Sequence, residues 1–182
     1  VVVNLCIDFL KNRADKKTVD LCSGSGAIAV ALDKISGAEV TAVEIDETAF
    51  SYLETNVKEN NSSVKPVMAD ALKICDTFAD GELDLIVSNP PYIKSADIET
   101  LQKEVRLEPR LALDGGEDGY DFYREIVSRW SRKLKKGGAL AFELGEGQAD
   151  AVKALMTDKD FSDFKISLDF GGVQRAIIGT LL

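Results

Sequence analysis

Residues 89–92, Asn-Pro-Pro-Tyr, bring together a side-chain amide, two prolines and an aromatic ring. Neither proline can donate a hydrogen bond to a sheet, and each disfavours helical backbone in the residue before it, so this turn is expected to be rigid. There the side-chain oxygen of Asn89 and the main-chain carbonyl of Pro90 can accept both hydrogens of one planar –NH₂ group. Pro91 completes the predicted substrate-binding turn, and Tyr92 can pack over the flat group. A stiff loop around a buried Tyr92, without chemistry, is the alternative.

An amide or aryl amine nitrogen is a poor nucleophile because its lone pair is delocalised. Two fixed acceptors would hold such a nitrogen in line with an electrophile and favour the charge that builds up on it during transfer. The chain contains no histidine, the commonest general base near neutral pH. We therefore predict a group transfer to nitrogen with Asn89, Pro90 and Tyr92 as the catalytic residues, after which the proton leaves to water.

A glycine turn occupies residues 20–26, Asp-Leu-Cys-Ser-Gly-Ser-Gly, between an apolar strand pattern and a helix pattern rich in small residues. Glycine lets a backbone turn tightly and approach a ligand without a Cβ in the way. Glu44 ends the next strand pattern, where its carboxylate can accept hydrogen bonds from both hydroxyls of a ribose. Together these residues predict a nucleoside site. A plain tight connection and a solvated glutamate are the alternatives.

The glycine turn also narrows the choice of nucleoside. It has no Gly-Lys-Ser/Thr for a triphosphate and lacks the third glycine of the dinucleotide fingerprint. S-adenosylmethionine fits better, because its amino-acid end can bind near Ser23 and Gly24 while Asp20 attracts its positive charge. Asp70 can accept a hydrogen bond from the adenine amine, although Asp equally favours a turn there. With two apolar contacts included, the predicted cofactor-binding residues are Asp20, Ser23, Gly24, Gly26, Glu44, Ile45, Asp70 and Ala71.

Alternating strand and helix patterns must position these motifs. Strands are predicted at about 18–22, 39–44, 64–68, 83–88, 139–144, 165–169 and 175–181, and helices at about 2–13, 27–32, 47–60, 119–134 and 147–156. Gly137-Gly138 is predicted to end the fourth helix, and Pro66 suits an edge strand. The last two strands predict a hairpin, and residues 93–117 a substrate-facing insertion. The result is an α/β fold with a doubly wound, mostly parallel seven-stranded sheet that binds ligands at the carboxyl ends of its strands.

Composition restricts the partners. The 182 residues fit one domain, 1–182, and a net charge of −9 opposes attraction to a nucleic-acid backbone. The basic run at 129–136 is interpreted as a solvated helix end.

The three cysteines lack the paired spacing of disulfide or zinc sites, so we predict that their thiols are reduced and structural and that the chain holds no metal. No apolar stretch approaches the roughly 20 residues that span a bilayer, so we expect a cytoplasmic monomer without membrane contacts.

With these residues in place, the whole chain resembles the catalytic domain of the release-factor glutamine methyltransferases, the HemK/PrmC family. The Asn-Pro-Pro-Tyr motif alone is shared with adenine amino-methyltransferases of DNA and RNA, so the other segments discriminate. The resemblance rests on residues 20–26, Ser88 to Ile93, Val105 to Pro109, Ala112 to Gly119, Asp121-Phe122-Tyr123, Glu143-Leu144-Gly145 with Gln148, and Asp169 to Gly172 with Arg175.

The resemblance implies a Rossmann-like class I methyltransferase. It would transfer a methyl group from S-adenosylmethionine, leaving S-adenosylhomocysteine, to the side-chain amide nitrogen of the glutamine in the Gly-Gly-Gln loop of peptide-chain release factors. By motif, Asn89, Pro90 and Tyr92 would hold that glutamine, and Gly24, Glu44 and Asp70 the donor. Two alternatives stay open. One is an adenine amino-methyltransferase, disfavoured by the acidic charge and the insertion, and the other is a module that binds S-adenosylmethionine without catalysis.

The chain departs from the family pattern in two places. Cys22 stands where many members have a glycine, a change that should matter little unless φ is positive there. The family's N-terminal helical domain has no counterpart in residues 1–182. Because the chain opens at Val1 in a helical pattern, we expect it to be a piece of a longer protein.

Overall fold

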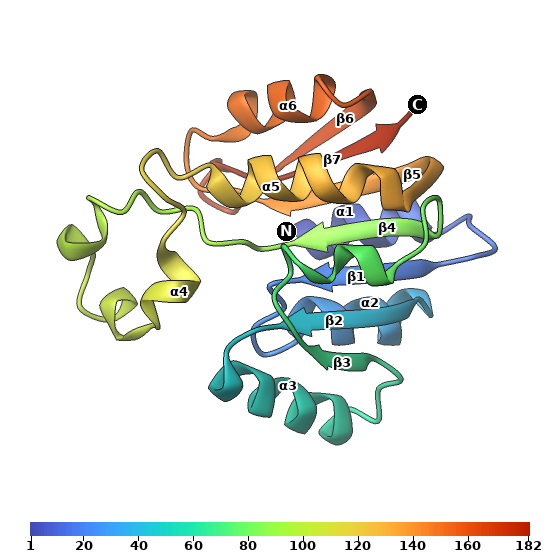
Figure 1. Cartoon of the computed structure of the whole chain (residues 1–182), viewed down its shortest axis with the longest axis horizontal. Helices are drawn as coiled ribbons and strands as arrows, with labels where there is room; N and C mark the ends of the chain where they lie inside the picture. The colour runs from blue at the N-terminus through green and yellow to red at the C-terminus, as the bar shows by residue number, and fades with distance from the viewer.

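The computed structural model describes residues 1–182 and builds them around a seven-stranded sheet of order β3-β2-β1-β4-β5-β7-β6 (Figure 1). The strands are β1 Lys17–Leu21, β2 Glu39–Glu44, β3 Lys65–Met68, β4 Leu83–Ser88, β5 Leu134–Glu143, β6 Phe161–Leu168 and β7 Gln174–Leu181. The α-helices are α1 Val2–Leu10, α2 Ala27–Ser36, α3 Glu47–Glu59, α4 Arg110–Leu113, α5 Asp121–Trp130 and α6 Ala149–Thr157. Short 3₁₀ turns are η1 Ile74–Thr77, η2 Ile98–Thr100, η3 Val105–Leu107 and η4 Ser131–Lys133.

The pairing of the strands confirms the predicted sheet. Strands β1 to β5 pair with one another in parallel, β7 is antiparallel to both β5 and β6, and the short β3 lies at an edge. This is the fold of the class I methyltransferases. Because β1 pairs with β2 on one side and β4 on the other, the strand order reverses at β1, where open α/β sheets bind their ligands.

Helices cover both faces of the sheet (Figure 1). Helices α1, α2 and α3 bury their apolar side chains on one face, and α5 and α6 on the other. A strand buried on both faces has no solvent side, which explains the near-continuous apolar run of β4. Every residue of β4 is buried, including Asp84 and Ser88.

The strand β5 begins five residues earlier than the predicted start at 139, and Gly137-Gly138 lies inside it. The prediction that these glycines end a helix is wrong, because α5 already ends at Trp130 and η4 follows. Gly137 has φ +73°, and a Cβ on Gly138 would lie 3.2 Å from the carbonyl oxygens of Leu83 and Asp84. The two glycines therefore allow an irregular, close pairing with β4, a role that their sequence pattern does not distinguish from a helix cap.

Residues 94–114 form an arm that projects from the sheet just after β4 (Figure 1). It contains η2, η3 and α4 but no long regular element, as predicted. Its two ends are tied together where the Ile93 amide donates to the Leu113 carbonyl over 2.9 Å and the Gly115 amide to the Ile93 carbonyl over 2.8 Å. The base of the arm is thus continuous with the turn that carries Tyr92.

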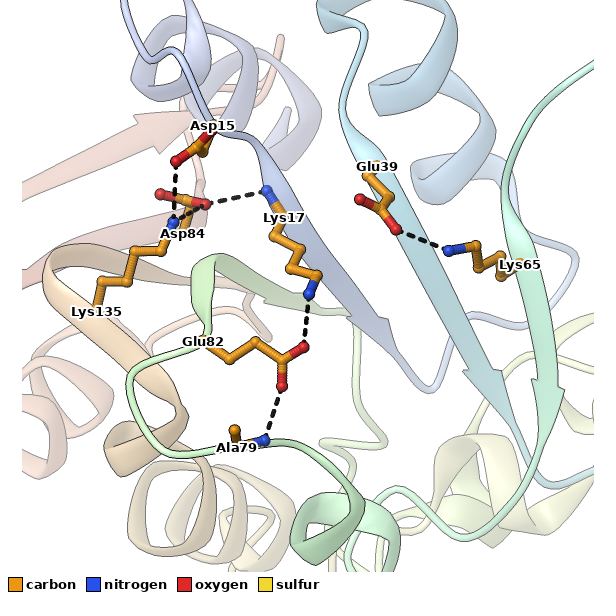
Figure 2. A network of polar contacts seen from close by, with 8 residues as sticks. All are labelled: Asp15, Lys17, Glu39, Lys65, Ala79, Glu82, Asp84 and Lys135. Atoms are coloured by element: carbon orange, nitrogen blue, oxygen red, sulfur yellow. Dashed lines mark hydrogen bonds and ion pairs between the residues drawn. The ribbon is translucent and has the colours of Figure 1, made fainter.

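The opposite edge of the sheet, at the amino ends of the strands, holds a network of paired charges (Figure 2). The buried carboxylate of Asp84 accepts hydrogen bonds from the Lys17 amide (3.1 Å) and the Lys135 ammonium (2.9 Å). Lys17 pairs with Glu82 over 2.7 Å. The charge of the buried Asp84 is thus compensated by Lys135, whereas the more exposed Lys17–Glu82 pair contributes little to stability.

The basic run at 129–136 is also largely paired with acids. Arg129 pairs with Glu125 over 2.6 Å, and Arg132 with Asp76. Lys133 is buried, not solvated as predicted, and its ammonium pairs with Asp80 over 2.7 Å.

None of the helices has the length and apolar character needed to span a membrane.

Candidate active site

The strand register brings the predicted motifs to one edge of the sheet. Leu21, the last residue of β1, pairs with Val43 of β2 and with Ser88, the last residue of β4. The glycine turn, the end of β2 and the Asn-Pro-Pro-Tyr turn therefore leave the sheet side by side. Met68, the last residue of β3, pairs with Glu44, which places Asp70 at the same edge. All predicted site residues lie at these carboxyl ends.

The glycine turn depends on two glycines for different reasons. Both have positive φ, +54° at Gly24 and +81° at Gly26. A Cβ on Gly26 would lie 2.3 Å from Cδ1 of Leu53, so the missing side chain lets α2 pack against α3. A Cβ on Gly24 would meet no heavy atom within 4 Å. Gly24 thus leaves open space beside the backbone, as a ligand-binding turn requires, and Ser23 holds the turn to β2 through its amide and the Val43 carbonyl (3.0 Å).

Cys22 has a left-handed backbone conformation, which could not be predicted from the sequence. Its φ is +55°. A cysteine in place of a glycine is expected to matter only if φ is positive there, and φ is positive. A side chain in this region costs roughly 1–2 kcal/mol. Burial, and then the nearby negative charge of Glu44, raise the pKa of the thiol to about 12, so the thiol stays neutral.

Asp20 is completely buried at the end of β1. Its Oδ2 accepts a hydrogen bond from the Ala29 amide over 3.1 Å, which caps the first turn of α2, while Oδ1 has no partner. Burial raises the pKa of this carboxyl to about 8, and the charge of Glu44 acts in the same direction. The unpartnered carboxyl oxygen beside the glycine turn can accept a hydrogen bond from the amino-acid end of S-adenosylmethionine, whose positive charge would favour the ionised form of Asp20.

The carboxylate of Glu44 is held by three backbone amides. Oε2 accepts from Gly24 over 2.7 Å, and Oε1 accepts from Ile45 and Asp46, each over 2.8 Å. The residue is buried to more than nine-tenths, so it is not a solvated strand-end glutamate. A carboxylate has about four lone-pair sites, which leaves capacity for a hydroxyl donor such as a ribose.

The remaining predicted cofactor contacts differ in accessibility. Ile45 is about half exposed (47%), so its side chain is available to a planar ligand. Ala71 is nearly buried, and its carbonyl accepts a hydrogen bond from the Trp130 indole over 2.9 Å. Asp70 accepts from the Leu72 amide over 2.9 Å and pairs with Lys73 over 2.9 Å. Asp70 thus has a turn-forming role, and a contact of Asp70 or Ala71 with adenine stays a prediction.

The Asn-Pro-Pro-Tyr turn presents free acceptors. Asn89 is exposed between buried neighbours, Ser88 on one side and Pro90 on the other. Its side chain makes no hydrogen bond within the chain, and the Pro90 carbonyl accepts none. Pro91 is buried, and the Ser88 hydroxyl donates to the Leu21 carbonyl over 2.8 Å. The turn therefore carries two acceptors that no group within the chain satisfies, one of them on the exposed side chain of Asn89.

Tyr92 is partly buried behind this turn. Burial, followed by the negative charge of Glu143, raises the pKa of its hydroxyl, so the ring is neutral at physiological pH. The backbone of Tyr92 packs so closely that a Cβ on Gly115 would lie 2.7 Å from its Cα. A Cβ on Gly145 would lie 2.9 Å from the Tyr92 ring.

Sequence reasoning assigned no site role to the residues at the end of β5. Glu143 is partly buried there, and burial raises the pKa of its carboxyl. Gln148 is buried and contacts the Tyr92 carbonyl. The rule applied to Glu44, a polar residue at a strand end, would have singled out Glu143 as well. No group of three or more Cys, Asp or Glu side chains lies so that it could hold a metal ion.

Comparisons with known proteins find similar methyltransferases. A model of the methyltransferase small domain family matches residues 3–108. The release factor glutamine methyltransferase of Geobacter sulfurreducens is 42% identical over 90% of this chain and 57% of its own length. That of Gloeobacter violaceus is 37% identical over 97% of this chain and 63% of its length. The chain thus spans about three fifths of these relatives.

Solved structures share the fold. The crystal structure of a methyltransferase from Pyrococcus furiosus superposes with a TM-score of 0.71, at 22% identity, over 98% of this chain and 82% of that chain. At this identity the likeness concerns the fold alone.

Proposed function

Because the chain belongs to the methyltransferase small domain family, we propose that it methylates the side-chain amide nitrogen of the glutamine in the Gly-Gly-Gln motif of peptide-chain release factors, with S-adenosylmethionine as donor. One observation carries the proposal. The two free acceptors, Asn89 Oδ1 and Pro90 O, lie at the strand ends that also carry the glycine turn and Glu44. The names of the relatives support the choice of acceptor.

The donor would be held by the glycine turn and by the two buried carboxyl groups of Asp20 and Glu44. When bound, S-adenosylmethionine supplies an electrophilic methyl group on a positively charged sulfur. Gly24 leaves space for its amino-acid end, and Asp20 offers the unpartnered oxygen to its positive charge. Glu44 would accept a hydrogen bond from a ribose hydroxyl at the one lone-pair site that the three amides leave open, and Ile45 would contact the adenine.

The acceptor glutamine would be oriented by the Asn-Pro-Pro-Tyr turn. Asn89 Oδ1 and Pro90 O each accept one hydrogen of its –NH₂ group, which fixes the nitrogen and favours positive charge on it. The neutral ring of Tyr92 packs against the planar amide. Transfer leaves one extra proton on the nitrogen, and this proton departs to water because the chain has no imidazole to accept it.

An adenine acceptor in nucleic acid would use the same turn but is less well supported. Nucleic-acid binding requires exposed cations to neutralise phosphates. The net charge is −9, and most of the cations of the basic run at 129–136 are paired with acids. We therefore assign a release factor, in the cytoplasm, as the partner of a monomeric catalytic domain formed by residues 1–182, without nucleic-acid or membrane partners.

Labelled donor tests the assignment. Incubation with a release factor should label it, and replacement of the Gln in its Gly-Gly-Gln motif should abolish the label. Label that persists on the replaced factor would contradict the assignment. Label on an oligonucleotide, but on no release factor, would favour the adenine alternative, and donor binding without transfer to either would indicate a non-catalytic module.

A further inference from the structure

The side-chain amide of Gln148 has four hydrogen-bond partners, which lie on three segments of the chain. Its Nε2 donates to the Tyr92 carbonyl over 3.1 Å and to the Gly119 carbonyl over 3.2 Å. Its Oε1 accepts from the Gly145 amide over 2.9 Å and from the Tyr123 hydroxyl over 3.2 Å. Both hydrogens and both lone pairs of the amide are thus used. A buried amide with partners for all of its polar atoms restrains the groups that it contacts.

The segments around Gln148 pack so closely that two of its neighbours have no room for a side chain. A Cβ on Gly119 would lie 2.6 Å from the Tyr92 carbonyl oxygen, and one on Gly145 would lie 2.7 Å from Gln148 Oε1. The Tyr123 hydroxyl has one hydrogen, which it shares between Gln148 Oε1 and the Glu143 carbonyl, the nearer acceptor at 2.9 Å. The end of β5, the start of α5 and the Asn-Pro-Pro-Tyr turn are therefore joined through one side chain.

We propose that Gln148 is a positioning residue, whose amide sets the distance and direction of Asn89 Oδ1 and Pro90 O by holding the Tyr92 carbonyl. Gln148 does not itself reach the acceptor group. Its effect is transmitted through the rigid backbone between Pro90 and Tyr92, in which the prolines prevent local adjustment. A small displacement of two catalytic acceptors can lower a rate about a hundredfold.

Gln148→Glu separates positioning from mere packing. The carboxylate keeps the volume and accepts from Gly145 and Tyr123, but it cannot donate to the carbonyls of Tyr92 and Gly119. Burial and the two facing carbonyls raise the pKa of this new carboxyl, and its protonated form can donate to one of them. We expect kcat with a release factor to fall at least tenfold at pH 8, with the donor Kd within twofold of the unsubstituted protein. The deficit should shrink as the pH falls to about 6.

The matched control is Gln174→Glu, which places the same charge on an exposed position at the start of β7. Its kcat should stay within twofold of the unsubstituted protein at every pH. A Gln148→Glu protein with unchanged kcat, or with a deficit that is the same from pH 6 to 8, would overturn the inference.

The rate measurement rests on the proposed function. A second measurement, hydrogen exchange in Gln148→Met, does not depend on that function. In Gln148→Met the side chain keeps its size and loses all four bonds. Hydrogen exchange of the Ile93 and Gly145 amides should accelerate at least tenfold, while the Ala49 amide at the start of α3 stays unchanged. Unchanged exchange at Ile93 and Gly145 would overturn the inference about Gln148, whatever the protein methylates. Failure of the unsubstituted protein to methylate a release factor would contradict only the proposed function.

Discussion

The Gly24 amide donates a hydrogen bond to Oε2 of Glu44 over 2.7 Å, so the glycine turn after β1 and the carboxylate at the end of β2 are already joined. The other oxygen of Glu44 is held by two further amides. The carboxylate is therefore oriented before any ligand arrives, which lowers the entropic cost of binding.

Glu44→Ala should weaken donor binding more than it affects transfer. Hydrogen bonds to a charged group contribute about 1.5–3 kcal/mol, so the Kd for S-adenosylmethionine should rise about ten- to a hundredfold. Calorimetric titration measures this Kd directly. Glu47→Ala removes an exposed carboxylate three residues along the chain and serves as the control. An unchanged Kd in Glu44→Ala would show that the donor does not contact this residue.

Asn89→Ala should do the reverse. It removes one of the two acceptors for the –NH₂ group, a loss that typically lowers kcat about 10²–10³-fold, but it leaves the glycine turn intact. Initial rates with labelled donor and a release factor check kcat, and the donor Kd should stay within about twofold. Asn4→Ala, an exposed amide on α1, should change neither. If Asn89→Ala abolished donor binding instead, the proposed division of roles between Asn89 and Glu44 would be wrong.

The sequence reveals those parts of the site that depend on local chain geometry. Asn89 and Glu44 each follow a strand pattern, and parallel strands end at one edge, so their proximity is predictable from the fold class alone. The role of Gln148 is not predictable, because it depends on the Tyr92 turn and the start of α5, which meet the end of β5 only in the folded chain. The same holds for Gly137-Gly138, whose pairing with β4 has no local signal, and for the positive φ of Cys22.

Asp20 should make stability depend on pH. Its pKa is about 8 in the folded protein and 3.8 ordinarily. Below pH 4 both states hold the proton, and between about pH 4 and 8 only the folded state does. The free energy of unfolding should therefore fall as the pH rises through this window, by up to about 1.4 kcal/mol per unit.

Asp20→Asn isolates this contribution, because an amide can still accept from the Ala29 amide but does not titrate. Urea unfolding of both proteins from pH 4.5 to 8.5 should show the unsubstituted protein losing stability relative to Asp20→Asn as the pH rises. Parallel curves would mean that Asp20 is ionised in the folded protein throughout.

Cys22 tests the cost of a side chain in left-handed backbone. Cys22→Gly and Cys22→Ala both remove the thiol, but only glycine relieves the strain at φ +55°. After the larger entropy of glycine in the unfolded chain is subtracted, Cys22→Gly should be the more stable by about 0.5–1 kcal/mol in urea unfolding. Ala151→Gly, on the exposed side of α6, should instead cost about 1 kcal/mol. Equal stabilities of the two Cys22 variants would argue against strain there.

Gly24 and Gly26 both have positive φ, but only Gly26 is packed against another side chain. Replacement by alanine should therefore affect donor binding at Gly24 and the stability of the fold at Gly26. In Gly26→Ala the new Cβ would collide with the fully buried Leu53, and strain plus overpacking should cost about 2–5 kcal/mol. In Gly24→Ala the Cβ meets no protein atom, so only the backbone strain of roughly 1–2 kcal/mol applies. The new methyl group would, however, occupy the space proposed for the donor. Gly24→Ala should therefore raise the donor Kd at least about tenfold while unfolding at a higher urea concentration than Gly26→Ala. Donor binding by Gly24→Ala at unchanged affinity would mean that the donor does not pass over this turn.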